Sequence, residues 1–401
     1  MPCWEAWHVS DSEAFPQLRK LTIRDCPMLE GEMLEQAFLR VIASLSDVSK
    51  IHNLRVSEVP QRTYQIMLRY EDNLSIVGCE SVVKSAFKAT SIKYLTCLHE
   101  IQLSESWCSL SFPDNCLPKS LKKLTICRCR ILEFPEQQQR KYNLVELKIE
   151  RCYSWFSLSL DAFPNLKKLE IFFCPSLESV SMSKSPHLSL QSVTIIGCDN
   201  LVSFAGEGLA APNLTHLELR RCNSLEALPS HMNSLLPSLH TFTILNCQEI
   251  CRFPEGGWPP NLKELTIGKQ WRSLSSMGNL DTFTHLTIYD DDDECTDLKS
   301  FPEAGSLPPL PSLTTLNLSS FKNLETLECN ELLRLTSLQQ LHIRWCNKLE
   351  NMEGEKLPSS LLLLHIEGCK LLREKCKNKH QQIWPKIEHI PTIVVDRQQI
   401  V

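Results

Sequence analysis

The chain has 401 residues, with 42 lysine and arginine residues against 47 aspartate and glutamate residues and a net charge of -5. This small, dispersed charge gives no basic patch of the kind that marks a nucleic-acid-binding surface. The longest apolar runs, such as residues 361–364, are far below the roughly 18 residues of a membrane span, and the first fifteen residues lack the pattern of a secretory signal. We expect a soluble protein of the cytoplasm or nucleus that binds no nucleic acid.

One phrase of ten residues recurs along the chain. It reads LTIRDCPMLE at 21–30, LTICRCRILE at 124–133, LEIFFCPSLE at 169–178, LELRRCNSLE at 217–226 and LHIRWCNKLE at 341–350. The repeats that contain it start three residues earlier. An isolated copy starts at residue 18, and clear copies start at residues 121, 144, 166, 190, 214, 239, 262, 283, 313, 338 and 361. The clear copies lie 21 to 25 residues apart, except for one gap of 30, and such a period is typical of leucine-rich repeats.

Apolar residues occupy positions 1, 4 and 6 of each repeat, counted from its first residue, and cysteine usually occupies position 9. In one copy these are Leu144, Leu147, Ile149 and Cys152. The alternation at positions 4 to 7 predicts a strand with one buried face, and the many prolines between strands disfavour long helices. The sequence therefore predicts an α/β leucine-rich-repeat solenoid, curved as a right-handed superhelix. We expect a parallel β-sheet on its concave face and irregular, proline-rich segments on its convex face.

Cysteine is abundant, and ten of the nineteen cysteines share the position-9 slot. Neighbouring strands place equivalent residues about 4.8 Å apart with parallel side chains, whereas a disulfide needs facing Cβ atoms nearer to about 3.8 Å. We therefore predict stacked, free thiols and a reducing compartment. The ten are Cys26, Cys79, Cys129, Cys152, Cys174, Cys198, Cys222, Cys247, Cys346 and Cys369.

The organisation along the chain follows from how well each stretch fits the repeat. We predict a single leucine-rich-repeat domain over 1–401, with degenerate N-terminal repeats at 1–100, regular repeats at 101–372 and a C-terminal cap at 373–401. Within these, residues 80–92 fit a short outer helix, and the acidic stretch at 289–295 fits a loop. In the cap, Trp384 is expected to cover the core of the last repeat.

Motifs for chemistry are missing from the sequence. The one Gly-Lys pair, at Gly268, lacks the upstream glycine and the hydroxyl residue of a nucleotide-binding loop. The closest cysteine pairs lack a second pair at structural-zinc spacing, and the acidic run lacks the glycine and distal glutamate of a calcium loop. No nucleophile motif frames any serine. We predict that the chain is not an enzyme and has no catalytic residue, no cofactor and no metal ligand.

The remaining candidate for function is the face that the strands display. Positions 3, 5, 7 and 8 vary in chemistry, and stacking makes them one continuous inner surface. Arginine beside exposed aromatic residues is typical of protein-binding hot spots, although most such residues on a sheet are simply solvated. The predicted partner-binding residues are Glu150, Arg151, Glu170, Phe172, Arg220, Tyr289, His342, Arg344 and Trp345.

Three stretches resemble one known family. They are WEAWHVSDSEAFPQLRKLTIRDCPMLEG at 4–31, the recurring LxIxxCxxLE with LPxSL between repeats, and LLREKCKNKHQQIWPKIEHIP at 371–391. The chain resembles the C-terminal leucine-rich-repeat region of plant intracellular nucleotide-binding leucine-rich-repeat disease-resistance proteins of the coiled-coil type. The resemblance extends over essentially the whole chain.

The resemblance implies a fragment, a truncated product or an excised domain, because family members carry a signalling domain and an ATP/ADP-switching domain before the repeats. It also implies recognition of a pathogen effector or of a guarded host protein, together with restraint of the switch domain, where ATP or ADP would bind. An alternative is the substrate-recognition repeat domain of an F-box-type ubiquitin ligase adaptor, although that class continues with a helical segment where this chain has prolines. A secreted repeat receptor is disfavoured because it would show asparagine at the position-9 slot.

Overall fold

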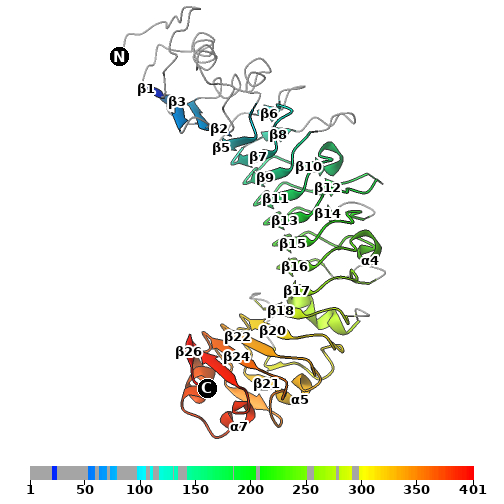
Figure 1. The fold of residues 1–401 in the computed structure, drawn as a ribbon, viewed down its shortest axis with the longest axis vertical. Coiled ribbons are helices and arrows are strands. Elements are labelled where there is room, and N and C mark those ends of the chain that lie inside the picture. Colours follow the sequence, from blue (N-terminus) through cyan, green and yellow to red (C-terminus); the bar gives the residue numbers. More distant parts are fainter. Residues whose placement is uncertain are drawn as a thin grey trace, which may run out of the picture. The chain divides into compact units, whose positions relative to one another are not determined.

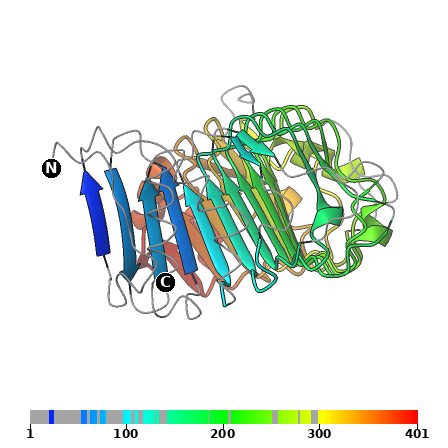
Figure 2. The same ribbon diagram turned by 90° about the horizontal axis from the view of Figure 1, so that it is seen from above.

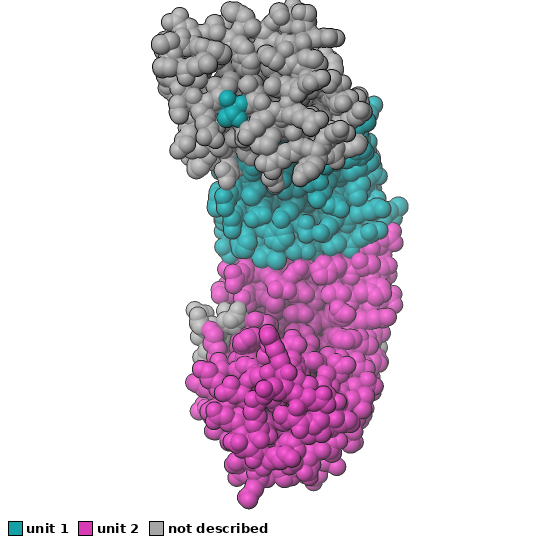
Figure 3. All heavy atoms as spheres, turned by 60° about the vertical axis from the view of Figure 1, so that its left-hand side comes forward, with its two compact units in different colours: residues 1–201 teal, residues 202–401 magenta. Residues whose placement is uncertain are grey.

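The structure is a computed structural model that divides into two compact units, residues 1–201 and 202–401 (Figure 3). It describes residues 20–24, 53–58, 63–69, 73–78, 97–104, 109–111, 117–129, 131–133, 142–183, 185–204, 208–250, 257–276, 280–290 and 298–401. The predicted helix at 80–92, most of the predicted loop at 289–295, and both Cys26 and Cys79 lie outside these ranges. Each unit is described by itself.

The described elements of unit 1 are mostly short strands (Figure 1). Its elements are β1 Lys20–Arg24, β2 Asn53–Glu58, β3 Thr63–Arg69, β4 Asn73–Gly78, β5 Glu100–Ser104, β6 Ser109–Ser111, β7 Lys123–Cys127, β8 Ile131–Glu133, β9 Glu146–Glu150, β10 Ser157–Ser159, the single-turn helix η2 Leu160–Ala162, β11 Lys168–Phe172, β12 Ser179–Ser181 and β13 Ser192–Ile196.

A parallel ladder of β5, β7, β9, β11 and β13 forms the main sheet of unit 1, and Figure 2 shows these strands side by side. Equivalent repeat positions pair, so Leu147 lies between Leu124 and Leu169. These three leucines are no more than 1% exposed. Burying such a side chain contributes about 1.5 to 3 kcal/mol, which fixes the register of every strand against its neighbour.

A second row of shorter strands lies on the other side of each coil. In unit 1, β6 pairs with β8 and β10 pairs with β12, both in parallel. Leu158 of β10 and Val180 of β12 are buried and pair with each other, so they close the interior opposite the main sheet. This arrangement of coiled repeats confirms the predicted leucine-rich-repeat fold.

The first four strands depart from simple stacking. β2 runs parallel to both β4 and β5, as repeats do, and places Leu54 against Leu74. In contrast, β3 runs antiparallel to β4 and to β1. A regular stack of repeats contains no antiparallel strand, so β3 is an insertion that the repeat pattern did not indicate. The division into degenerate repeats at 1–100 stays a prediction.

Unit 2 repeats the same plan. Its elements are β14 Ser203–Phe204, β15 His216–Arg220, α4 Met232–Leu235, β16 Thr241–Leu245, β17 Glu264–Ile267, η3 Lys269–Ser276, β18 His285–Tyr289, β19 Ser300–Phe301, β20 Thr315–Ser319, β21 Thr326–Glu328, α5 Cys329–Leu332, β22 Gln340–Arg344, β23 Asn351–Glu353, β24 Leu363–Glu367, α6 Lys370–Lys377, α7 Trp384–Ile387, β25 Thr392–Val395 and β26 Gln398–Gln399. Among the described residues no helix exceeds eight residues, as the prolines predicted.

Eight parallel strands of unit 2 share one inward column at position 4. The strands are β15, β16, β17, β18, β20, β22, β24 and β25, paired in that order. Leu217 heads the column, and every member of it is buried. The following residues are Phe242, Leu265, Leu286, Leu316, Leu341, Leu364 and Ile393.

The cysteines of position 9 are buried and free in all eight described copies, as predicted. Their thiols also make a weak local bond: Cys152 Sγ donates to the Glu150 carbonyl at 3.7 Å, and Cys346 Sγ to the Arg344 carbonyl at 3.4 Å. Burial raises the pKa of the Cys198 thiol to about 12. The slot therefore combines apolar packing with a weak bond from the thiol to the turn.

Residue 8 of most repeats has a left-handed backbone, which turns the chain from the strand toward the buried cysteine. The φ angle is 55° at Arg151, 54° at Phe173 and 61° at Trp345. The N–H of this residue donates to the next coil, as from Trp345 to the Glu367 carbonyl at 2.9 Å. The turn thus extends the sheet's hydrogen-bond ladder by one step.

The C-terminal segment continues the stack and then ends it. β25 pairs in parallel with β24, whereas β26 returns antiparallel along β25. Buried isoleucines of this segment, including Ile383 and Ile387, cover the interior, while Trp384 is only half-buried and packs under the Lys379 ammonium at 4.8 Å. The expectation that Trp384 covers the core of the last repeat stays a prediction.

Candidate functional site

The outward residues of the main sheet are those at positions 3, 5 and 7, and we call the surface that they form the sheet face. Strand alternation places them opposite the buried leucines. Burial follows this alternation, since β9, for example, alternates half-buried and buried residues from Glu146 to Glu150. The predicted site residues fall on this face or in the turn directly after it.

In unit 1 the structure brings four predicted residues together. Glu150 of β9 pairs in register with Phe172 of β11, and Glu170 lies two residues before Phe172. The Lys148 ammonium lies 5.0 Å from the Phe172 ring centre and 3.4 Å from a Glu150 carboxylate oxygen. Arg151 follows Glu150 in the turn. The result is a mixed ionic and aromatic surface in which the charges already satisfy one another.

In unit 2 the structure groups four of the five predicted residues. Tyr289 of β18 faces Ser319 of β20, which in turn faces Arg344 of β22. His342 is on β22 with Arg344, and Trp345 follows in the turn. Arg220 stands apart on β15, because β16 and β17 separate it from β18, and it is bound to Glu218 at 2.5 Å.

The position-8 residues lie in the left-handed turn rather than on the strand, which corrects the expectation of one continuous four-position surface. Trp345 is 54% exposed, yet its ring packs over Gly368 of the next coil. A Cβ at Gly368, where φ is +66°, would come within 2.6 Å of that ring. Glycine is therefore required there by both the backbone and the tryptophan. Phe173 and Gly197 form the same pair in unit 1.

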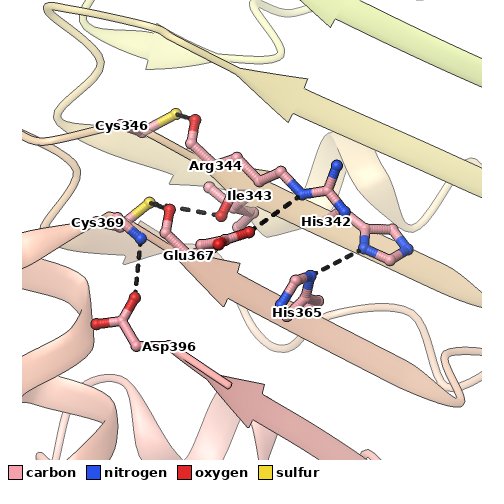
Figure 4. Close-up of polar contacts among 9 residues, drawn as sticks. His342, Ile343, Arg344, Cys346, His365, Glu367, Cys369 and Asp396 are labelled. Carbon is pink, nitrogen blue, oxygen red and sulfur yellow. Dashed lines mark hydrogen bonds and ion pairs between the residues drawn. The ribbon is translucent and has the colours of Figure 1, made fainter. Parts of the chain in front are cut away.

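Two members of the unit 2 group, His342 and Arg344, contact residues of the next strand, β24 (Figure 4). His342 and His365 pair in register on β22 and β24, with their Nδ1 atoms 3.3 Å apart. Arg344 Nε lies 3.8 Å from a Glu367 carboxylate oxygen. Burial, together with the charges of Arg344 and His365, lowers the pKa of His342 to about 4, so this imidazole is neutral near pH 7.

The sequence reasoning missed His365 and Glu367. The signal for His365 was present, because LHIRWC at 341–346 and LHIEGC at 364–369 place histidine at the same repeat position. Stacking alone then puts the two imidazoles side by side. The role of Glu367 depends on the direction of a long side chain, which the repeat pattern does not give.

Comparison with known proteins identifies relatives in Arabidopsis thaliana. At3g14460, a protein named for disease resistance, is 32% identical over 316 residues, which are 75% of this chain and 21% of that protein. The disease resistance proteins RPP4 and RPS4B are 26% and 27% identical, and their matches cover 52% and 58% of this chain. The chain is a leucine-rich-repeat member of the plant disease-resistance family. It spans about a fifth of the length of these curated relatives, with 19% of RPP4 and 23% of RPS4B covered.

Two solved structures are similar to this chain, both with low TM-scores. CroV588, a circular leucine-rich-repeat protein, has a TM-score of 0.33 and 18% identity, over 68% of this resistance-family chain and 44% of that one. TLR13, solved with ssRNA13, has a TM-score of 0.31 and 15% identity, over 83% and 50%. No protein-family model matches the chain. The fold assignment rests on the strand register and the buried columns.

Other kinds of site were sought across the described part of the resistance-family chain. Within it, no three or more His, Cys, Asp and Glu side chains gather in a way suited to a metal ion. None of its described helices has the length and apolar character that crossing a bilayer requires. The sheet face therefore remains the candidate surface for function.

Proposed function

We propose that this chain is a non-catalytic recognition module of a plant immune receptor, and that it binds a protein through the sheet face. The observation that carries the proposal is the group formed by Tyr289, His342, Arg344 and Trp345 on one face of a disease-resistance relative. Its partner is a pathogen effector or a host protein that the receptor guards. Catalysis and cofactor binding have no part in this role.

The physical case rests on how firmly this group is held. Tryptophan, tyrosine and arginine contribute most at protein interfaces because each buries a large area and also makes directed polar contacts. The Trp345 ring is supported by Gly368 on one side, and Arg344 is oriented by Glu367. A side chain that is already ordered loses less entropy on binding, which raises the affinity that each contact yields.

The module also has a regulatory part in the proposal. In a full-length receptor it restrains a nucleotide-switch domain, where ATP or ADP binds, and partner binding releases that restraint. The receptor acts in the cytoplasm or the nucleus. The relationship to disease-resistance proteins supports this role over that of a ubiquitin-ligase adaptor.

The test compares alanine variants of Arg344 and Trp345 with Leu333→Ala, an exposed control on the other side of the coil. The full chain is used to capture partners from infected and uninfected plant tissue. We expect Trp345→Ala and Arg344→Ala each to weaken capture by about tenfold or more, with thermal unfolding unchanged. Capture that survives both substitutions, or that Leu333→Ala reduces equally, contradicts the proposal.

A further inference from the structure

The pair formed by His342 and His365 has a geometry that ordinary sheet packing does not require. The two residues occupy the same position of neighbouring coils, and their strands are paired there in register. Their Nδ1 atoms face each other at 3.3 Å, and the two ring planes are nearly perpendicular at 85° (Figure 4). Two ring nitrogens thus converge on the solvent side of the sheet.

The other nitrogen of His342 lies beside an acceptor. Its Nε2 is 3.3 Å from the Gln340 side-chain oxygen. With the ring proton on Nε2, where it can be donated to that oxygen, Nδ1 presents a lone pair toward His365. A histidine that binds a metal has this same pattern, with one nitrogen on the ion and the other donating to an oxygen.

The spacing of the two Nδ1 atoms matches that of two ligands on one ion. Nitrogen ligands at about 2.0 to 2.1 Å from a tetrahedral metal lie about 3.3 Å apart. We propose that His342 and His365 form a two-histidine chelate for a divalent ion of the copper and zinc class, with water at the remaining positions. On binding, the proton of His365 resides on Nε2, so that both Nδ1 lone pairs reach the ion.

The surrounding charges permit such an ion. The nearby Arg344 opposes a cation, but its charge is offset by Glu367 at 3.8 Å. Copper should bind to the two imidazoles more tightly than zinc, following the usual order of affinities for divalent ions.

Two other described histidines, His187 and His285, make different contacts. His187 Nε2 lies 3.0 Å from the Phe163 carbonyl, and His285 Nδ1 lies 2.9 Å from the Thr284 hydroxyl. Each of these places a ring nitrogen against a protein oxygen instead of another imidazole. His285 is on the same sheet face as the pair and therefore serves as a matched control.

The experiment titrates Cu²⁺ into the full chain after alkylation of accessible thiols, which removes competing sulfur ligands. Electron paramagnetic resonance should show one bound Cu²⁺ with splitting from two nitrogens. His342→Gln and His365→Gln should each weaken binding at least tenfold and remove that two-nitrogen splitting, while His285→Gln should change neither. Thermal unfolding without metal checks that each variant folds.

Three results would overturn the chelate. The first is a wild-type spectrum without two nitrogen ligands, a reading that needs no variant to fold. The second is loss of binding in only one of His342→Gln and His365→Gln. The third is an equal loss in His285→Gln, which would mean adventitious binding at scattered histidines. Zn²⁺ should displace the Cu²⁺ signal only when in excess.

Discussion

Both units have an apolar interior, but groups of neighbouring strands in them carry different side chains on the sheet face. At the outward position 5, strands β9 and β11 of unit 1 present Lys148 and Glu170, and each of these residues forms an ion pair within its own strand. Unit 2 presents uncharged Thr266, Thr287 and Asn317 in register, with Asn317 donating to the Thr287 hydroxyl at 3.0 Å. The inward columns are apolar in both units, so the coil is specified by its buried side alone.

This difference shows why a repeat can keep its fold while its surface changes. Each strand is fixed by inward leucines that contact neighbouring coils, and stability is roughly a sum of such contacts. Outward residues contribute little to that sum when they are exposed ion pairs. They can therefore vary to suit a partner without loss of the fold.

Charge in the interior should break both units equally. Leu147→Asp in unit 1 and Leu217→Asp in unit 2 each bury an unpaired carboxylate at a position no more than 1% exposed. We expect losses of several kcal/mol in the free energy of unfolding, measured by urea denaturation and circular dichroism. The control is Glu218→Gln, on the outward side of the same strand as Leu217. A large difference between the two leucine variants would show that the interiors are not equivalent.

Replacing a buried position-9 cysteine with serine should lower stability by a smaller amount, and by the same amount in both units. Cys198→Ser and Cys247→Ser place a hydroxyl in a fully buried slot and should each lower stability by about 1 to 3 kcal/mol. Cys127→Ser, at an outward and half-buried position, should change stability by less than about 0.5 kcal/mol. Equal losses at all three positions would argue against a special environment at the slot.

Added salt should change the effect of a surface substitution on the charged strands of unit 1, but not on the uncharged strands of unit 2. Lys168→Gln removes the 2.9 Å contact of Lys168 with Glu170 in unit 1 and should cost about 0.2 to 1 kcal/mol at low ionic strength. The cost should shrink as salt is added, because exposed charges are screened. Thr287→Val in unit 2 should show no such dependence. Denaturation at low and high salt provides the measurement, and a salt-independent cost at Lys168 would contradict the ionic reading of unit 1.

The smallest expected effect is a loss of stability at low pH that depends on Asp396, near the C-terminal end of unit 2. Asp396 accepts the Gly368 N–H at 2.9 Å and pairs with Arg373 at 3.3 Å, which lowers the pKa of its carboxyl below the ordinary value of 3.8. Because the pKa of this carboxyl is lower in the folded than in the unfolded chain, the ionised carboxylate stabilises the fold at pH values above the unfolded pKa. This stabilisation is lost as the pH falls below about 4.

Asp396→Asn should therefore be less stable than the wild type at pH 7, and the two should converge toward pH 3. Urea denaturation at each pH gives the comparison. If the difference in unfolding free energy between wild type and Asp396→Asn stayed constant down to pH 3, the charge of Asp396 would not be the source of its stabilising effect.

The repeat architecture was predictable because its signal is written many times. The inward positions of each copy are apolar, so register, burial and the fate of cysteines such as Cys152 followed directly. The antiparallel strand β3 was not predictable, because it lies between repeats and has no periodic signal of its own.

The candidate site was only partly predictable. Alternation placed His342, Arg344 and Glu170 on the sheet face without any knowledge of the structure. It did not reveal that Trp345 lies in a left-handed turn against Gly368, because that depends on backbone angles rather than on period.

The last strand of unit 2 has a consequence for solubility. A parallel sheet that ended on β25 would offer unpaired N–H and carbonyl groups as a template for another molecule. β26 covers that side in the opposite direction, and it is only two residues long, Gln398–Gln399. Such a brief, polar border gives an incoming strand almost nothing to extend, so copies of the protein are kept from joining end to end into fibres at this side.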